Sequence, residues 1–117
     1  MVPVEPMAYL RKEEEKVEMD YPAGRVWTAI QEVLTSLDWS IEEINQSARH
    51  VKVKTKSSFM SFGSVLLIDV TPVKENSTRV SVVAETPVTT ITSIADFGQS
   101  KRRINQLWTE LARKLAT

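Results

Sequence analysis

The sequence contains no cysteine and a single histidine, His50, among its 117 residues. The absence of cysteine excludes disulfide bonds, thiolate catalysis and metal sites with thiolate ligands. A lone histidine also excludes a metal site built from several imidazoles. We therefore expect neither a metal nor any other cofactor.

Long apolar runs and an excess of one charge are lacking too. No stretch approaches the roughly 20 apolar residues that span a bilayer, and the first seven residues lack the apolar segment of a signal peptide. Fifteen basic side chains balance fifteen acidic ones, so no global attraction to nucleic acid or anionic lipid is expected, although local peripheral membrane contact stays open. The default expectation is a cytoplasmic domain; an envelope location would need a signal or anchor that had been removed.

The composition is that of one folded domain, with 42% hydrophobic and 26% charged residues. Two domains in 117 residues would each be too small to bury a sufficient core. Residues 1–13 contain proline and show no hydrophobic periodicity. We expect a flexible lead-in over 1–13 and one domain over 14–117.

Hydrophobic periodicity predicts five strands and two helices. Alternating or continuously apolar segments predict strands at 16–21, 39–45, 50–56, 64–71 and 78–85, with Pro72 ending the fourth. Spacings of three and four predict a helix over 23–37, opened by Pro22. A second helix follows from the terminal apolar stripe, which consists of Phe97, Ile104, Leu107, Trp108, Leu111 and Leu115. Ser93 or Asp96 is the expected N-cap of that helix.

The predicted fold class is therefore α+β, with the order β-α-β-β-β-β-α. Short turns between consecutive strands favour a single antiparallel sheet of about five strands. Two helices with one apolar stripe each must then cover one face of that sheet. Trp27 and Trp108 are the largest groups on the two stripes, and we expect them to anchor the core.

Two sets of residues resemble known families. The step from a strand into Tyr21-Pro22-x-x-x-Val26-Trp27 resembles the opening of helix-grip domains. Phe62-Gly63, Thr89-Thr90-Ile91 and Asp96-Phe97-Gly98 followed by Ile104 are similar to a group of uncharacterised bacterial domains. The chain is also similar to the small helix-grip domains of envelope lipoproteins, such as the C component of the outer-membrane protein assembly machine.

The resemblance spans residues 15–115 and implies a helix-grip-like fold with no catalytic residues. One position departs from the pattern, because the uncharacterised group tends to have asparagine two residues after the glycine where this chain has Ser100. A hydrogen-bonding role is not carried over to that position.

Two motifs that suggest chemistry have simpler structural interpretations. Asp96-Phe97-Gly98 matches the magnesium-binding tripeptide of protein kinases, but the chain has no glycine-rich or catalytic loop. His50 alternates with Lys52, Lys54 and Lys56, no acid or serine stands at a readable triad spacing, and no aromatic residues lie between the lysines to stack on bases. We interpret the tripeptide as a helix entry and the basic stripe as a solvated strand face that also protects a sheet edge.

The candidate binding residues lie in two loops and on the terminal helix. They are Phe59, Met60, Phe62, Thr89, Thr90 and Trp108. The apolar side chains of the first loop either fold back over the sheet or form an exposed contact surface. The uncharged segment from 86 to 92 is either a strand extension or the polar lip of a groove.

The leading functional hypothesis is a non-catalytic binding module. A groove between the terminal helix and the sheet would hold an apolar small molecule or a segment of a partner protein. The alternative is a peripheral cell-envelope scaffold or adaptor that contacts a protein or membrane through the Phe59–Phe62 loop or a sheet edge. An enzyme is not expected, because the sequence shows no converging acid–base pair; a pocket lined jointly by His50, Asp69 and Glu85 would change that.

Overall fold

The structure is a computed structural model that describes residues 10–55, 65–87 and 99–116. In the described residues, two helices and five strands follow one another as predicted, which confirms the α+β class and the order β-α-β-β-β-β-α. The elements are β1 (Leu10–Met19), α1 (Ala23–Ser36), β2 (Ser40–Asn45), β3 (His50–Lys54), β4 (Val65–Lys74), β5 (Ser77–Pro87) and α3 (Gln99–Leu115).

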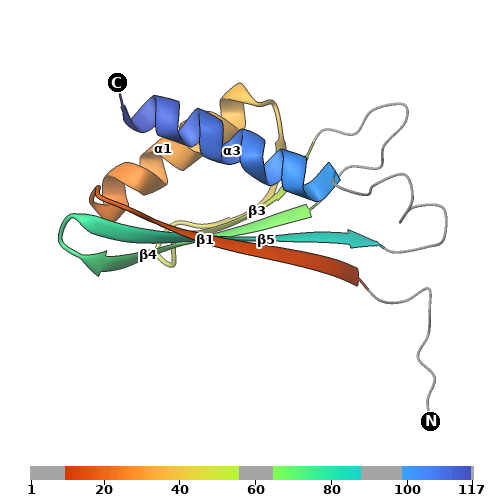
Figure 1. Cartoon of the computed structure of the whole chain (residues 1–117), viewed down its shortest axis with the longest axis horizontal. Coiled ribbons are helices and arrows are strands. Elements are labelled where there is room, and N and C mark those ends of the chain that lie inside the picture. The colour runs from red at the N-terminus through yellow and green to blue at the C-terminus, as the bar shows by residue number, and fades with distance from the viewer. Residues whose placement is uncertain (1–9, 56–64, 88–98, 117) are drawn as a thin grey trace, which may run out of the picture.

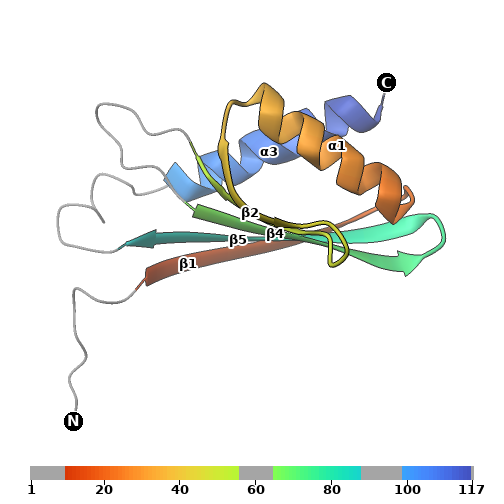
Figure 2. The ribbon, with the colours of Figure 1, turned by 180° about the vertical axis from the view of Figure 1, so that it is seen from behind.

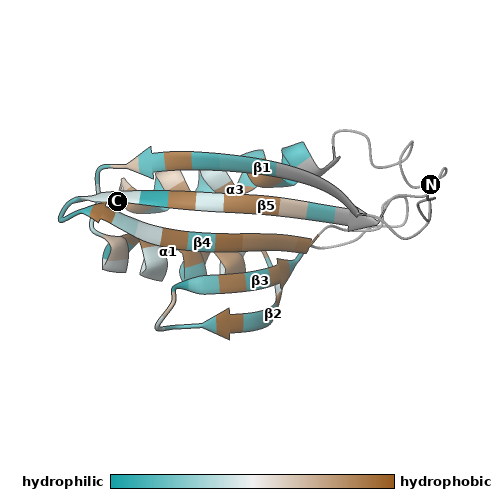
Figure 3. Ribbon diagram, turned by 90° about the horizontal axis from the view of Figure 1, so that it is seen from below, coloured by the Kyte–Doolittle hydropathy of each residue, from teal (hydrophilic) through white to brown (hydrophobic). Residues whose placement is uncertain are grey.

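The five strands form one antiparallel sheet in the order β1-β5-β4-β3-β2. The first and last strands are therefore neighbours, and α1 carries the chain from the β1 edge of the sheet to the β2 edge (Figure 3). β2 to β5 follow one another as sequential antiparallel neighbours. This connectivity leaves β1 and β2 as the two edge strands of the described sheet.

Both helices lie on the same face of the sheet (Figures 1 and 2). The strand register aligns Val51, Ile68 and Val82 in one row on that face, and all three side chains are fully buried. From the helical side the core is closed by the fully buried residues Val26, Ile30, Leu34, Ile104, Leu107 and Leu111. The apolar face of the sheet is thus covered as the two helical stripes predict.

The end of α1 explains a core residue that the sequence does not reveal. Asp38 has a positive φ of 63°, and the N–H of Trp39 reaches back to the carbonyl oxygen of Leu34 at 3.3 Å. The N–H of Asp38 also bonds the carbonyl of Thr35, at 3.1 Å, which completes a Schellman motif. In this motif the residue after the left-handed position packs against the last helical turn, and Trp39 is accordingly buried.

Pro72 does not end β4, contrary to the sequence-based prediction, because the strand continues to Lys74. β3 pairs with β4 only from Val65 to Asp69, so Pro72 has a strand neighbour on the β5 side alone. A register shift follows immediately after Pro72. Proline is tolerated at such a half-unpaired, irregular position because its missing N–H breaks no ladder bond.

The start of β1 also differs from the start that hydrophobic periodicity predicts. β1 begins at Leu10, six residues before the predicted start, so four residues of the expected lead-in belong to the strand. Its stretch from Arg11 to Lys16 is entirely charged and shows no alternation. Pairing with β5 along ten positions, rather than hydrophobic pattern, holds this segment in the sheet.

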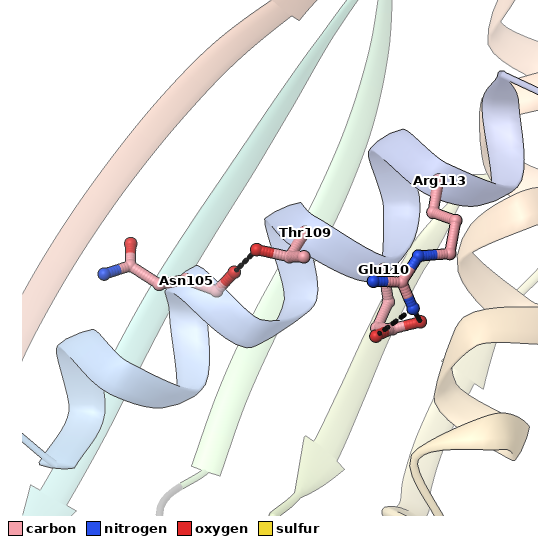
Figure 4. A network of polar contacts seen from close by, with 4 residues as sticks. All are labelled: Asn105, Thr109, Glu110 and Arg113. Atoms are coloured by element: carbon pink, nitrogen blue, oxygen red, sulfur yellow. Dashed lines mark hydrogen bonds and ion pairs between the residues drawn. The ribbon is translucent and has the colours of Figure 1, made fainter.

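The terminal helix α3 is amphipathic, as predicted. Ile104, Leu107 and Leu111 are fully buried, whereas Trp108 is only partly buried. Along the helix, Thr109 Oγ1 donates to the carbonyl of Asn105 at 2.9 Å, and Arg113 forms a forked pair with Glu110 at 3.0 and 3.1 Å (Figure 4). The predicted caps Ser93 and Asp96, and Phe97, lie outside the described residues.

Within the described ranges, neither helix combines the length and the apolar character that a bilayer-crossing helix requires.

Candidate functional site

An apolar hollow of about 460 Å³ lies between α3 and the edge strand β1. We call it the α3–β1 groove; it is lined by Val17, Met19, Tyr21, Trp108, Ala112 and Leu115. Its size falls within the roughly 300–1,000 Å³ typical of small-molecule pockets. Val17 is 36% exposed and Ala112 is exposed, so the groove opens to solvent along the sheet edge.

The groove follows directly from two periodicities. Val17 and Met19 lie on the helical face of β1, because their register partners Val80 and Thr78 are buried there. On α3, Trp108, Ala112 and Leu115 are four and three positions apart and therefore share one side of the helix. The two rows face each other at the sheet edge.

Glu15 ties α3 to β1 next to Trp108. The indole Nε1 of Trp108 donates to Glu15 Oε1 at 2.9 Å, and Lys101 Nζ lies 3.6 Å from Glu15 Oε2. Hydrogen bonds to a carboxylate are stronger than those between neutral groups. The side of Trp108 that lines the groove is thus held in a defined orientation.

The other end of the groove is fixed around Tyr21. Arg25 Nη2 donates to the carbonyl of Leu115 at 2.7 Å, and the Arg25 guanidinium lies 4.8 Å from the centroid of the Tyr21 ring. The hydroxyl of the buried Thr78 donates to the Tyr21 carbonyl at 2.6 Å. Side-chain cations stabilise the carbonyl end of a helix, so Arg25 joins the end of α3 to the start of α1.

Between the middle of α3 and the sheet, the described side chains of the helix are buried in the core. Leu107 and Leu111 are fully buried against the β5 side of the sheet, and Trp27 is buried on α1. The groove is therefore peripheral, beside the core rather than inside it. Within the described residues, α3 thus buries its apolar side chains over the sheet and leaves a groove open at the β1 edge.

A second hollow, of about 510 Å³, lies between α1 and the end of α3. Its lining consists of Thr28, Gln31, Glu32, Thr35, Ser36 and Lys114, all of them polar. Lys114 Nζ lies 3.4 Å from Glu32 Oε1 across this surface. A polar lining with a charge pair provides little apolar surface for an apolar ligand to bury. The α3–β1 groove is therefore the candidate site.

His50 has an acidic neighbour that the sequence did not reveal. Its Nδ1 lies 2.7 Å from Asp69 Oδ1, because the two residues are register partners on β3 and β4. The side chains are 32% and 48% exposed on the face of the sheet away from the helices. Glu85 is the register partner of Val65, four residues from Asp69 along β4, so the three groups do not meet at one point. In the described chain no three metal-ligating side chains cluster.

No protein-family model matches the sequence, and neither does any curated protein. Solved structures do match. The chain is similar to the ZhuI aromatase/cyclase from Streptomyces sp. R1128, with 12% identity, a TM-score of 0.60, and 92% of this chain and 96% of that chain covered. It is similar to Ara h 8.0201 with 8% identity, a TM-score of 0.67, and 92% and 99% covered.

Norcoclaurine synthase from Thalictrum flavum, in complex with dopamine and hydroxybenzaldehyde, matches with 10% identity, a TM-score of 0.62, and 99% and 95% of the two chains covered. These matches cover nearly the whole of both chains at TM-scores of 0.60 to 0.67, so the proteins share a fold with this chain. The chain has the helix-grip fold. The fold-level part of the sequence resemblance is thereby confirmed, whereas the similarity to lipoprotein domains of the outer-membrane assembly type stays a prediction.

Of the predicted binding residues, Trp108 alone lies in the part of the chain that the structure describes. Phe59, Met60, Phe62, Thr89 and Thr90 lie outside the described residues, so the loop-based scaffold hypothesis stays a prediction. Trp108 is described, and it lines the groove.

Sequence reasoning missed the groove's other residues, although a signal existed. Val17 and Met19 alternate on a strand, and Ala112 and Leu115 continue the helical spacing from Trp108. Periodicity showed that each row faces inward but not that the rows meet at an edge.

Proposed function

We propose that this helix-grip protein is a non-catalytic binding module whose α3–β1 groove takes a small apolar ligand. The observation that carries the proposal is a ligand-sized hollow with four apolar and two aromatic side chains at a solvent-exposed rim. Monomeric soluble proteins seldom leave such a cluster open without a use for it. Burial of an apolar ligand there would release ordered solvent at little conformational cost.

The groove is held in shape before any ligand arrives. Glu15 fixes Trp108 at one end, and Arg25 with Thr78 fixes Tyr21 at the other. A preorganised wall reduces the entropy lost on binding. The indole N–H of Trp108 is already donated to Glu15, so the Tyr21 hydroxyl and the neighbouring Arg25 guanidinium are the groups that would orient a ligand with one polar end.

The neighbours in fold support this class of function without defining the ligand. The Thalictrum synthase structure contains dopamine and hydroxybenzaldehyde, which are small aromatic molecules. At 10% identity no residue role transfers, and the shared feature is a sheet and helix that can enclose a small ring. The enzymatic neighbours do not make this chain an enzyme.

A binding role is preferred to catalysis because of the chemistry of the lining. Val17, Met19, Ala112 and Leu115 cannot transfer protons or attack a substrate. Glu15, which contacts the groove residue Trp108, is already engaged by Trp108 and Lys101. General acid–base catalysis would need a second titratable group converging on the same ligand atom.

The experiment uses N-phenyl-1-naphthylamine, a neutral apolar dye whose fluorescence rises in apolar surroundings. We expect saturable binding with one site per chain. Ala112→Trp would fill the groove and abolish this binding. Gln106→Trp is the matched control, because Gln106 is exposed and lies neither three nor four positions from a groove residue of α3, so the same indole is added away from the groove lining.

Binding that is absent, or that survives Ala112→Trp unchanged while thermal unfolding shows an intact fold, would rule out the groove as the site. Chemical-shift changes confined to Val17, Met19 and the indole N–H of Trp108 would locate the dye independently. A library of small aromatic acids, amines and alcohols, competed against the dye, would then define the preferred polar end.

A further inference from the structure

The edge strand β1 is unusually well suited to pair with another strand. It is ten residues long and stays in unbroken register with β5 from Leu10 to Met19. In the described chain β5 is its only strand neighbour, so one side of β1 presents backbone N–H and C=O groups outward. The other edge strand, β2, has six residues and a register shift between Ile41 and Glu43, which hinders pairing.

The charges on β1 form a pattern that is complementary to itself. Glu14 and Lys16 lie on the face of the sheet away from the helices, because their register partners Val83 and Ser81 face outward there. They flank Glu15 symmetrically. When two copies of this strand run antiparallel about a two-fold axis at Glu15, Glu14 of each copy stands opposite Lys16 of the other. The same axis sets sequence position 12, a lysine, opposite Glu18, which also pairs with Arg79 of its own chain at 2.8 Å. Glu14 and Lys16 lie 3.7 Å apart within one chain, so the partner strand adds a second opposite charge to each.

From this we infer that two copies of the chain associate through their β1 edges, antiparallel and centred on Glu15, to give one continuous sheet across the dimer. A two-fold interface requires a surface complementary to itself, and alternating opposite charges about one residue meet that requirement. Directly opposed cross-strand residues of opposite charge stabilise a pairing, whereas like charges destabilise it. The register with Glu15 at the axis sets opposite charges against each other at all four of these positions.

The like charges of the two Glu15 residues at the axis do not prevent this pairing. Each Glu15 side chain points to the helical face, where Trp108 Nε1 and Lys101 Nζ of its own copy hold the carboxylate at 2.9 and 3.6 Å. The carboxylate is therefore drawn toward its own α3 and is already paired with a cation. When the two copies approach, each Glu15 carboxylate is accompanied by the Lys101 ammonium of its own chain, so two Glu15–Lys101 pairs meet rather than two unpaired carboxylates.

Apolar burial comes from the helical face. Val17 is 36% exposed at the mouth of the α3–β1 groove. In the centred register, position 17 of one copy stands opposite position 13 of the other, so the backbone of residues 11–13 of the second copy passes along the open side of the groove. Exposed ion pairs contribute little free energy by themselves, so their role here is to select the register of the two strands. The free energy of association comes from backbone hydrogen bonds between the strands and from burial of the apolar edge around Val17. The inference does not depend on a ligand.

The test measures self-association by sedimentation equilibrium and by light scattering coupled to size exclusion, over a range of concentrations. The parent chain is expected to form a dimer. Glu14→Lys sets a lysine opposite Lys16 of the other copy, and Lys16→Glu sets a glutamate opposite Glu14. Each single variant should therefore raise the dissociation constant by about tenfold or more. The double variant Glu14→Lys/Lys16→Glu restores opposite charges and should dimerise like the parent.

Mixing the two single variants is the experiment that tests the proposed register most directly. One chain then carries two lysines and the other two glutamates at these positions, so the mixture should form a heterodimer as stable as the parent dimer. Lys52→Glu is the matched control, because Lys52 lies on the outer face of β3, away from the β1 edge. It should leave association unchanged.

A parent chain that stays monomeric at all concentrations would overturn the inference, and so would single variants whose mixture fails to associate. A dimer that Lys52→Glu disrupts and the β1 variants do not would overturn it too, by assigning the interface to the outer face of the sheet. Circular dichroism and thermal unfolding check that each variant is folded. If Glu14→Lys unfolds the chain, Glu14→Gln removes the attraction without repulsion and should still weaken the dimer.

Discussion

The indole N–H of Trp108 donates a hydrogen bond of 2.9 Å to a carboxylate oxygen of Glu15, 93 positions earlier in the chain. This contact joins the terminal helix to the opposite end of the sequence and sets the width of the α3–β1 groove. Lys101 approaches the second oxygen of the same carboxylate at 3.6 Å. One acidic side chain on the edge strand β1 therefore positions the helix that closes the fold.

Replacing Trp108 with phenylalanine should lower the free energy of unfolding by about 1 kcal/mol. The ring volume is largely kept, while the hydrogen bond to Glu15 is lost and its carboxylate returns to solvent. Urea denaturation followed by circular dichroism measures the change. Glu15→Gln keeps an acceptor oxygen, so it should cost less than Glu15→Ala; equal costs would show that the hydrogen bond does not stabilise the fold.

The two tryptophans predicted to anchor the core should differ in their contributions. Trp27 is buried and donates to Gln46 Oε1 at 2.7 Å, so truncation to alanine should cost about 3–5 kcal/mol. Trp108 is only partly buried, so Trp108→Ala should cost less, about 2–3 kcal/mol. Equilibrium unfolding of both variants under the same conditions decides the order. A larger loss for Trp108 would mean that the groove is part of the core.

Thr78 is fully buried, and its hydroxyl is the hydrogen-bond donor to the Tyr21 carbonyl at 2.6 Å. Thr78→Val keeps the shape but leaves that carbonyl without its donor, and we expect a loss of about 1–3 kcal/mol in unfolding free energy. Thr78→Ser keeps the hydroxyl and removes one methyl group, so it should retain Tyr21 in place. If the valine and serine variants were equally stable in urea denaturation, packing rather than the hydrogen bond would hold this corner of the groove.

Arg49 stands in the turn between β2 and β3 with a positive φ of 51°. This conformation is strained for a residue with a Cβ atom and is accessible to glycine. Arg49→Gly should therefore raise the unfolding free energy by about 0.5–1 kcal/mol despite the added freedom of the unfolded chain. Ala48→Gly in the same turn, where no positive φ occurs, should be neutral or destabilising, and thermal unfolding compares the two.

The fold was largely predictable because its elements carry clear periodicities. The alternation of Val51, Val53 and Thr55 placed one face of β3 in the core, and the terminal stripe placed Ile104, Leu107 and Leu111 there. Trp39 was missed because its burial depends on the Schellman motif at the end of α1, which in turn depends on a left-handed Asp38. Aspartate adopts that conformation without a distinctive sequence signal.

The candidate site was much less predictable. Its walls come from β1 and α3, which are distant in sequence and meet only because β1 pairs with β5. Trp108 was singled out as a large side chain on the helical stripe. Val17 and Met19 were predicted only as part of a half-buried strand, and Tyr21 as the step from that strand into the first helix. Nothing local indicates which helix covers them.

The sequence by itself determined the class of fold, the two-sided character of the terminal helix and the absence of thiolate or multi-histidine chemistry. These are properties of local spacing and composition, which a chain carries with it into any structure. The tertiary structure alone decided that α3 buries its apolar side chains over the sheet and leaves a groove at the β1 edge. That outcome depends on strand order and on the contact between Glu15 and Trp108, which arise only when distant segments pack together.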